Sequence, residues 1–323
     1  MIRVDHRFAS MGGTARVTLE SAAVSEEQLE RHARAIRTLI EHAEATLTRF
    51  RADSELSALN RDPRSAVPAS PLMRHLALAV RAAGARSGGL VDATLLGSLE
   101  RQGYATSRAG VAPAMLDEAL AAAPPRRPAR PHPSRAHAGV GVDEEGCVVR
   151  PPGVRIDSGG LGKGLAADLA AMTVPTGIRY AISCGGDLAA GGTTPESPWE
   201  IAVHSARTGE EIHRLRVRTG GVATSGITSR LWRRPDGTFA HHLIDPSSGA
   251  PAWTGLVAVT AVATATIDAE VLAKTAMLSG PERARTLLGR RGGVLQHDDG
   301  RIEIVAGPPT VRLRRPAAVE RAA

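Results

Sequence analysis

The segment Ile156–Gly164 (IDSGGLGKG), followed by LAADLAAM, constrains the fold of this chain more than any other stretch. Its order predicts a strand that ends at Asp157, a tight turn made possible by four glycines, and a helix that continues to about residue 173. The free N–H groups and the positive end of such a helix, together with Lys163, form a site suited to a phosphate anion. The glycine order matches neither a Walker loop nor a GxGxxG turn, so a glycine-rich connector with a surface lysine is the alternative.

Lysine is almost absent from this chain. Lys163 and Lys274 are its two lysines, and the other basic residues counted with them are arginines. A GC-rich coding bias exchanges lysine for arginine wherever a protein tolerates the change. The two lysines that remain therefore mark places where a compact ammonium is needed and a flat guanidinium does not fit. Chance survival of two lysines is the alternative explanation.

The rest of the chain predicts a mixture of helices and strands. Residues 1–20 alternate like a strand, and Ser25 is a suitable N-cap for a long helix over 25–49. Further helices are expected at 71–86, 113–123 and 268–279, a hairpin at 139–150, and strands at 179–184, 199–204, 211–218 and 256–263. These elements do not follow a regular βαβ alternation, which predicts the α+β class.

The chain is long enough for one large domain, which we expect over residues 1–313. Prolines and arginines crowd the segment 121–137, which excludes a helix or a central strand and predicts a surface loop. The last residues, 314–323, are expected to form a disordered tail.

Charge and composition exclude several classes of protein. The formal net charge is +7, but arginines are interleaved with Asp and Glu, and aromatic residues make up only 2% of the chain. A surface that binds nucleic acid by base stacking needs aromatic side chains among its cations, so no nucleic-acid partner is expected. No apolar stretch approaches the length of a transmembrane helix, and the N-terminus lacks a signal-peptide pattern. We therefore expect no membrane insertion and a cytoplasmic location.

Other short segments also place glycines beside polar residues. Residues 50–60 (FRADSELSALN) predict a turn that leads into a short helix, and Asp92 and Thr94 come just after a glycine pair. The segment 183–187 (SCGGD) ends a strand with two glycines, which lets a ligand approach the backbone. Two more segments complete the set, namely 223–226 (ATSG) and 241–251 (HHLIDPSSGAP).

In this order, the segments resemble the ApbE family of FAD:protein FMN transferases. The family pattern is met by Met-Gly-Gly-Thr at 11–14 and by residues 50–60, 89–94, 157–168, 185–187, 224–226 and 242–251. Each motif is weak alone, but their common order over residues 8–280 is specific. The resemblance implies an ApbE-like (T-fold-like) α+β fold in which two α/β lobes enclose an FAD cleft.

The resemblance also implies which residues contact FAD. The family lysine of the glycine-rich turn contacts FAD, and Lys163 matches it. Tyr104 stands where the family often has an aromatic residue near the adenine, although core packing explains it nearly as well. The residues expected at the FAD site are Met11, Asp92, Thr94, Tyr104, Asp157, Gly160, Lys163, Gly185, Gly186, Ser225, Gly226 and His242.

The metal site of the family is where this sequence departs. Family members hold Mg²⁺ with a carbonyl of the glycine-rich turn plus an Asp and a Thr four residues apart; the matching positions are Gly160, Glu270 and Lys274. A glutamate can bind Mg²⁺, but a charged lysine has no lone pair to offer. Either Mg²⁺ binds Glu270 with a neighbour such as Asp268 or Thr275, or the Lys274 ammonium pairs with Glu270 and replaces the ion. A purely structural ion pair is the third possibility.

The resemblance implies an enzyme that splits the diphosphate of FAD, attaches FMN to a Ser or Thr hydroxyl of an acceptor flavoprotein, and releases AMP. The residues expected to act in catalysis are Lys163, His242, Lys274 and Asp245. Asp245, or else Asp157, is the carboxylate expected to accept the hydroxyl proton, and a turn cap is the alternative role of Asp245. The same site would serve an FAD pyrophosphatase, or a non-catalytic FAD-binding protein with a degenerate metal site.

Overall fold

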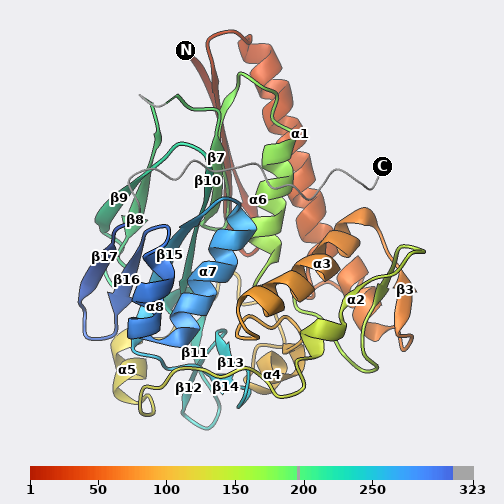
Figure 1. The fold of residues 1–323 in the computed structure, drawn as a ribbon, viewed down its shortest axis with the longest axis vertical. Coiled ribbons are helices and arrows are strands. Elements are labelled where there is room, and N and C mark those ends of the chain that lie inside the picture. Colours follow the sequence, from red (N-terminus) through yellow and green to blue (C-terminus); the bar gives the residue numbers. More distant parts are fainter. Residues whose placement is uncertain (195–196, 308–323) are drawn as a thin grey trace.

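The structure is a computed structural model that describes residues 1–194 and 197–307. An eight-stranded sheet, antiparallel at every pair, runs through it in the order β1-β2-β6-β7-β10-β15-β16-β17 (Figure 1). The strands are β1 (Ile2–Ser10), β2 (Gly13–Ser21), β6 (Arg179–Cys184), β7 (Asp187–Gly191), β10 (Gly220–Gly226), β15 (Leu256–Ala263), β16 (Gly293–His297) and β17 (Ile302–Val305).

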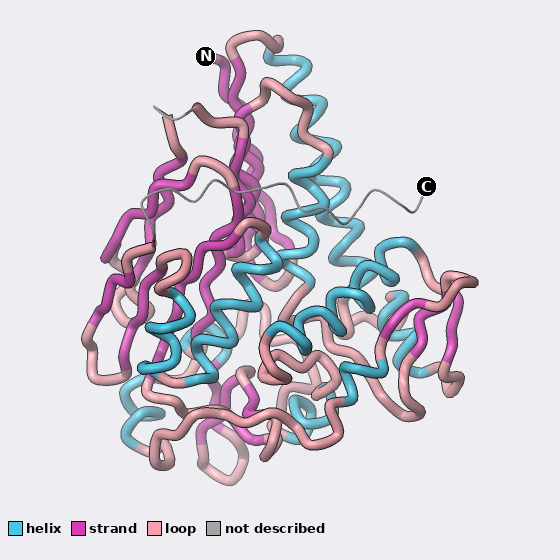
Figure 2. Tube along the Cα trace, in the orientation of Figure 1, coloured by secondary structure: helices cyan, strands magenta, loops and turns pink. Residues whose placement is uncertain are grey.

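Four helices cover one face of this sheet: α1 (Glu26–Leu47), α6 (Gly162–Met172), α7 (Thr266–Ser279) and α8 (Pro281–Leu288) (Figure 2). Helix α1 begins where the sequence predicts, because Ser25 accepts a hydrogen bond from the Gln28 N–H and forms a capping box with it. Its buried residues Leu29, Ile36 and Ile40 lie on one stripe and pack with strands β1, β2 and β6.

The opposite face of the sheet is covered by a hairpin of β8 (Trp199–His204) and β9 (Glu211–Val217). The alternation of side chains along the central strands explains the two layers. In β6, Ile182 packs with the helices, whereas its neighbour Ala181 belongs to a cluster with Trp199 and Val217 of the hairpin. Both faces of the sheet centre are therefore buried.

A second group of elements packs beside the helices. It contains α2 (Glu55–Arg61), α3 (Pro71–Arg86), α4 (Leu96–Arg101) and a small sheet of β3 (Ala66–Pro68), β4 (Gly141–Val142) and β5 (Cys147–Val149). Its apolar core reaches into the first group through Leu161 and Leu165, at the start of α6, and Val271 of α7. The glycine-rich turn thus lies where the two groups meet.

Short elements close the lower end of the molecule in Figure 1. They are α5 (Leu116–Ala121), β11 (Leu231–Arg233), β12 (Phe239–His241), β13 (Ile244–Asp245), β14 (Ala250–Pro251) and the 3₁₀ turns Ala136–Gly139 and Thr228–Arg230. The segment 122–135 is irregular, as predicted for 121–137, but its backbone is pinned: Ala129 N–H donates to the Leu278 carbonyl and Arg127 N–H to that of Trp253. It therefore acts as a strap across the end of α7.

The main elements agree with the sequence-based expectations, including the helices of residues 25–49 and 71–86 and the hairpin of 139–150. The strand expected to end at Asp157 is not formed, because residues 150–161 are irregular, and the alternating stretch 1–20 is a hairpin of two strands, β1 and β2. Strands β7 and β10 and helix α4 were not predicted. Among the described residues, no helix combines the length and the apolar character that a bilayer span needs. The expected tail, 314–323, lies outside the described residues.

Candidate functional site

A cleft opens where the glycine-rich turn, the segment 90–99 and the last turns of α7 meet residues 242–244, which lead from β12 into β13. It brings together six residues that the sequence analysis assigned to the site. They are Asp92, Tyr104, Asp157, Gly160, His242 and Lys274. These residues are up to 182 positions apart in the chain, between Asp92 and Lys274, and come from the segments whose order pointed to one site.

The glycine-rich turn leads into α6, but its N–H groups are partly used within the protein. The Gly162 N–H donates to the Ser158 carbonyl at 2.7 Å, and the Gly164 N–H donates to Oε2 of Glu270 at 3.0 Å. A carboxylate from α7 therefore occupies part of the helix end that the sequence offered to an anion. The positive charge available to a bound anion comes mainly from side chains.

Lys163 is held by a carboxylate on a neighbouring strand. Its Nζ lies 3.1 Å from Oδ2 of Asp187, whose side chain is only 1% exposed. Asp187 follows the turn of Gly185 and Gly186, which have φ values of 57° and 98° and link β6 to β7. Lys163 passes close to this turn, since a Cβ on Gly185 would lie 3.0 Å from Lys163 Cδ. Asp187 is a residue that the sequence analysis did not assign to the site.

Lys274 is likewise held by a carboxylate, in this case one on its own helix, α7. Its Nζ donates to Oε1 of Glu270 at 2.9 Å, and the two side chains are 12% and 1% exposed. The Lys274 chain also lies against the glycine-rich turn, because a Cβ on Gly160 would come 3.3 Å from Lys274 Cε. Lys274 lines the cleft, whereas Lys163 does not line it and lies against the β6–β7 turn. Both ammonium groups nevertheless act on the same carboxylate, Glu270.

The four charged groups influence one another. Burial alone would lower the pKa of Lys163, but the carboxylates of Asp187 and Glu270 outweigh it and raise that pKa above its usual value. Burial raises the pKa of Asp187 to about 6, although Lys163 opposes the shift. For Glu270, burial is outweighed by Lys274 and Lys163, which lower its pKa. Glu270 thus stays ionised between two ammonium groups.

Arg49 orients one wall of the cleft. Its Nε donates to Oδ1 of Asp157 at 2.8 Å and its Nη2 to the Tyr104 carbonyl at 2.7 Å. Its guanidinium lies 4.7 Å from the Tyr104 ring centre and 4.2 Å from that of Phe50. Burial raises the pKa of Asp157, and Arg49 opposes this shift. Arg49 was not predicted, because no motif in the sequence links it to Asp157.

Asp92 holds its own loop together. Its Oδ1 accepts hydrogen bonds from the Thr94 N–H at 2.9 Å and hydroxyl at 2.6 Å, and its Oδ2 lies 3.2 Å from Nδ1 of the buried His137. The Asp157 N–H donates to the Ala93 carbonyl at 2.8 Å, which ties this loop to the glycine-rich turn. The hydrogen bonds between Asp92 and Thr94 therefore fix the shape of this cleft wall. The contact of Asp92 with His137 was not predicted.

His242 lines the cleft as a neutral imidazole. Burial lowers its pKa to about 3, and the charges of Lys274 and Lys163 add to the shift. Its Nδ1 is buried and has no hydrogen-bond partner among the described residues. The neighbouring His241 is fully buried and packs edge-on against Trp253, with ring centres 4.7 Å apart. Only His242 of this pair faces the cleft.

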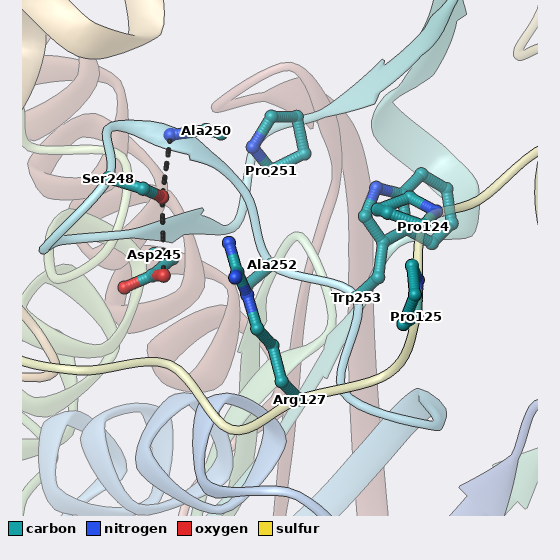
Figure 3. Close-up of a pocket in the computed structure, with 9 residues that line it drawn as sticks. All are labelled: Pro124, Pro125, Arg127, Asp245, Ser248, Ala250, Pro251, Ala252 and Trp253. Atoms are coloured by element: carbon teal, nitrogen blue, oxygen red, sulfur yellow. Dashed lines mark hydrogen bonds between the residues drawn. The ribbon is translucent and has the colours of Figure 1, made fainter.

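Asp245 lies in a separate pocket, beside Arg127 and Trp253 (Figure 3). Its Oδ1 accepts hydrogen bonds from the Arg130 N–H at 3.0 Å and from the Ser247 hydroxyl at 2.9 Å, and the Ser248 hydroxyl donates to Oδ2 at 3.2 Å. Its carboxylate is thus occupied as a turn cap that also fixes the strap. This placement does not support Asp245 as the proton acceptor in the cleft.

The remaining expected contacts lie around the lysines or away from the cleft. Met11 and Gly12 form the β1–β2 turn with φ values of 52° and 70°, and the Gly185 N–H donates to the Thr14 carbonyl. This turn therefore lies beside Gly185. Ser225 and Gly226 end β10, and neither lines the cleft.

The close approach of α6 to α7 gives a testable prediction. A Cβ on Gly164 would lie 2.7 Å from the Ile267 Cα and 2.9 Å from Oε2 of Glu270. Gly164→Ala should therefore lower the free energy of unfolding by about 1–3 kcal/mol, because backbone must move to admit the methyl group. Gly162→Ala is the matched control, since its nearest neighbour would be Ser158 Cβ at 3.5 Å. Equal denaturant midpoints for the two variants would contradict the packing argument.

Comparison with known sequences supplies relatives for most of the chain. The sequence model described as the ApbE family matches residues 11–296. The FAD:protein FMN transferase of Treponema pallidum is 30% identical over 274 residues, which cover 80% of this chain and 74% of the relative. That of Escherichia coli K12 is 34% identical over 146 residues, 44% of this chain. This last match spans only 41% of the length of the relative.

Solved structures share the fold. The ApbE protein of Thermotoga maritima superposes with a TM-score of 0.75 at 24% identity, covering 94% of this chain and 97% of that one. The flavin transferase ApbE of Vibrio cholerae gives a TM-score of 0.70 at 20% identity, with coverage of 94% and 97%. The expected mixed α and β fold is thereby confirmed.

Proposed function

This chain belongs to the ApbE family, and from that premise we propose that it is an FAD:protein FMN transferase. It binds FAD in the cleft, cleaves the diphosphate and joins FMN to a Ser or Thr hydroxyl of an acceptor flavoprotein. AMP is the second product. Relatives that carry this name match the chain over up to 274 residues, which supports the same reaction here.

The observation that carries the proposal is a pair of ammonium groups, both acting on Glu270, at the glycine-rich turn. Lys163 and Lys274 reach it from different helices, and each is fixed by one buried carboxylate. A diphosphate is the ligand that such a pair suits, because it places two adjacent anionic groups where two fixed cations can face them. In a partly buried cleft this attraction is stronger than in water.

The reaction balances as a phosphoryl transfer. The acceptor hydroxyl oxygen forms a bond to the phosphorus on the FMN side, and the bond from that phosphorus to the bridging oxygen breaks. The electron pair of the broken bond leaves on AMP, and the hydroxyl proton is released. Cations placed at the non-bridging and leaving oxygens stabilise the charge that builds up as AMP departs.

We assign acceptance of the hydroxyl proton to His242. It is neutral, lines the cleft and has a buried Nδ1 without a protein partner among the described residues. Asp157 is a weaker candidate, because Arg49 already binds its Oδ1. A neutral imidazole has the free lone pair that taking up this proton requires, although a pKa of about 3 makes it a weak base.

The test is incubation of the purified protein with FAD and a candidate flavoprotein that carries no flavin. We expect the mass of the acceptor to increase by the mass of one FMN less one water, while AMP appears in equal amount. AMP formed equally fast without any acceptor would instead identify a pyrophosphatase. FAD that stays bound with no AMP formed would identify a binding protein.

A further inference from the structure

The environment of Lys274 shows whether this site can hold the divalent ion that the family resemblance implies. Both carboxylate oxygens of Glu270 are already engaged, Oε1 by the Lys274 ammonium and Oε2 by the Gly164 N–H. An ammonium 2.9 Å from the only carboxylate of the expected set repels a metal ion and offers it no lone pair. The ligand set Gly160, Glu270 and Lys274 therefore does not fit Mg²⁺.

The neighbouring oxygens do not replace the missing ligands. Asp268 points to another helix, where its Oδ1 pairs with Arg86 at 2.8 Å. The Thr275 hydroxyl donates to the Val271 carbonyl at 2.7 Å and is buried within α7. Within residues 1–194 and 197–307, no cluster of three or more His, Cys, Asp or Glu side chains could hold a metal ion. Mg²⁺, which prefers a full shell of oxygen ligands, finds no built site here.

The ammonium itself is well placed to act. Lys274 lines the cleft, and its chain lies against Gly160, next to the turn that also carries Lys163. Its three N–H groups exceed the single hydrogen bond to Glu270, so the others can point to phosphate oxygens. The ion pair with a buried carboxylate keeps the lysine in one position, as a metal ion would be kept by its ligands.

We propose that the Lys274 ammonium is the resident cation of this site, so that diphosphate cleavage needs no divalent metal. This inference rests on the proposed function for its activity test but not for its metal-binding test. The Lys274 N–H groups stabilise the non-bridging oxygens and the AMP oxygen that takes the electron pair. Lys163, on the other side of the turn, supplies the second positive charge.

The first experiment measures metal and activity separately on the wild-type protein. Electron paramagnetic resonance follows Mn²⁺ binding, with and without FAD, and chromatography follows AMP formation in EDTA and in MgCl₂. We expect no stoichiometric Mn²⁺ binding without FAD and equal AMP formation in both solutions. Stoichiometric Mn²⁺ binding to the free protein, or AMP formation that stops in EDTA, overturns the inference. Absence of AMP in every solution overturns the proposed function alone, because Mn²⁺ binding still decides the metal question.

The second experiment restores the family ligands with Glu270→Asp and Lys274→Thr together. This double variant should gain Mn²⁺ binding and form AMP only when a divalent metal is present. Glu270→Gln with Lys274→Met removes both charges without leaving a buried charge unpaired, and it should lose AMP formation by on the order of 100-fold with or without metal. Retained activity in this neutral pair would contradict the role of Lys274.

A control variant tests whether loss of any helical ion pair has these effects. Arg31→Met breaks an i,i+4 pair with Glu27 on the exposed face of α1. It should leave AMP formation, EDTA resistance and Mn²⁺ binding unchanged. Thermal unfolding of each variant confirms that the compared proteins are folded.

Discussion

Lys163→Met is expected to lower the rate of AMP formation from FAD by on the order of 100- to 1,000-fold. The ammonium of Lys163 is fixed at 3.1 Å from Asp187 and reaches the turn from α6. Removing it would take away one of the two cations that we propose to stabilise the diphosphate as charge moves to the leaving AMP. The loss should appear in kcat more than in the KM for FAD, because the interaction strengthens in the transition state.

Stability must be separated from catalysis in this experiment. Lys163→Met leaves Asp187 buried without its partner, and breaking such a pair costs about 3–5 kcal/mol of unfolding free energy. Adding Asp187→Asn removes the stranded charge, so the double variant should recover most of the stability. It should not recover AMP formation. Recovery of both would show that Lys163 acts only in folding.

Lys163→Arg provides a second control for this position, since it keeps the charge and changes only the shape. The lysine chain runs so close to the β6–β7 turn that a Cβ on Gly185 would be 3.0 Å from its Cδ. A planar guanidinium needs more width than an ammonium. We therefore expect Lys163→Arg to lose most of the activity, and full activity in this variant would contradict the shape argument.

The regular elements of the fold follow from local patterns. Strands β6, β8 and β15, which are rich in apolar residues, span the residues predicted for them. Strand β10 (GGVATSG) was missed, because small residues carry no such signal. The glycine at position 221 is explained by packing, since a Cβ there would lie 2.3 Å from the Thr266 Cα of α7. Such an approach between distant segments leaves no local trace in the sequence.

The site was predictable where a motif carries its own chemistry. Lys163 and Lys274 stood out by rarity, and the structure places Lys274 against Gly160, in the turn that precedes Lys163. Their partners were harder to find: Asp187 is on strand β7 whereas Lys163 is on helix α6, and Arg49 is 108 positions from Asp157. Charge pairs over such distances depend on tertiary folding, which a single sequence does not report.

The segment from His242 to Asp245 shows a further limit of the sequence. Both residues were expected to act in catalysis, but the chain turns between them, so His242 lines the cleft and Asp245 lines the neighbouring pocket. The sequence alone does not show which of the two pockets each side chain lines. Hydrogen bonds from Ser247 and Ser248 fix the carboxylate away from the lysines. We therefore propose His242, rather than Asp245, as the proton acceptor.

His242→Ala should consequently reduce FMN transfer by on the order of 100- to 10,000-fold, the usual contribution of a positioned acid–base group. The pH profile distinguishes this from a structural effect. The pKa of His242 is lowered to about 3, so the wild-type imidazole is already unprotonated at pH 6 to 8 and should not titrate there. Without it, hydroxide must take the proton, and the rate of the variant should rise with pH over that range. A variant with the wild-type profile would contradict the assignment.

His241 supplies the matched comparison for that result, because it has the same side chain one position away. Its pKa is also lowered to about 3 by burial, but its ring packs against Trp253 in the core and does not reach the cleft. His241→Phe keeps that ring contact and removes the acceptor of a hydrogen bond from the Leu243 N–H. It should lower the melting temperature while each folded molecule transfers FMN at the wild-type rate. Catalysis that depends on His242 and not on His241 would place proton transfer in the cleft, because the pKa is lowered to about 3 in both residues and only His242 lines the cleft.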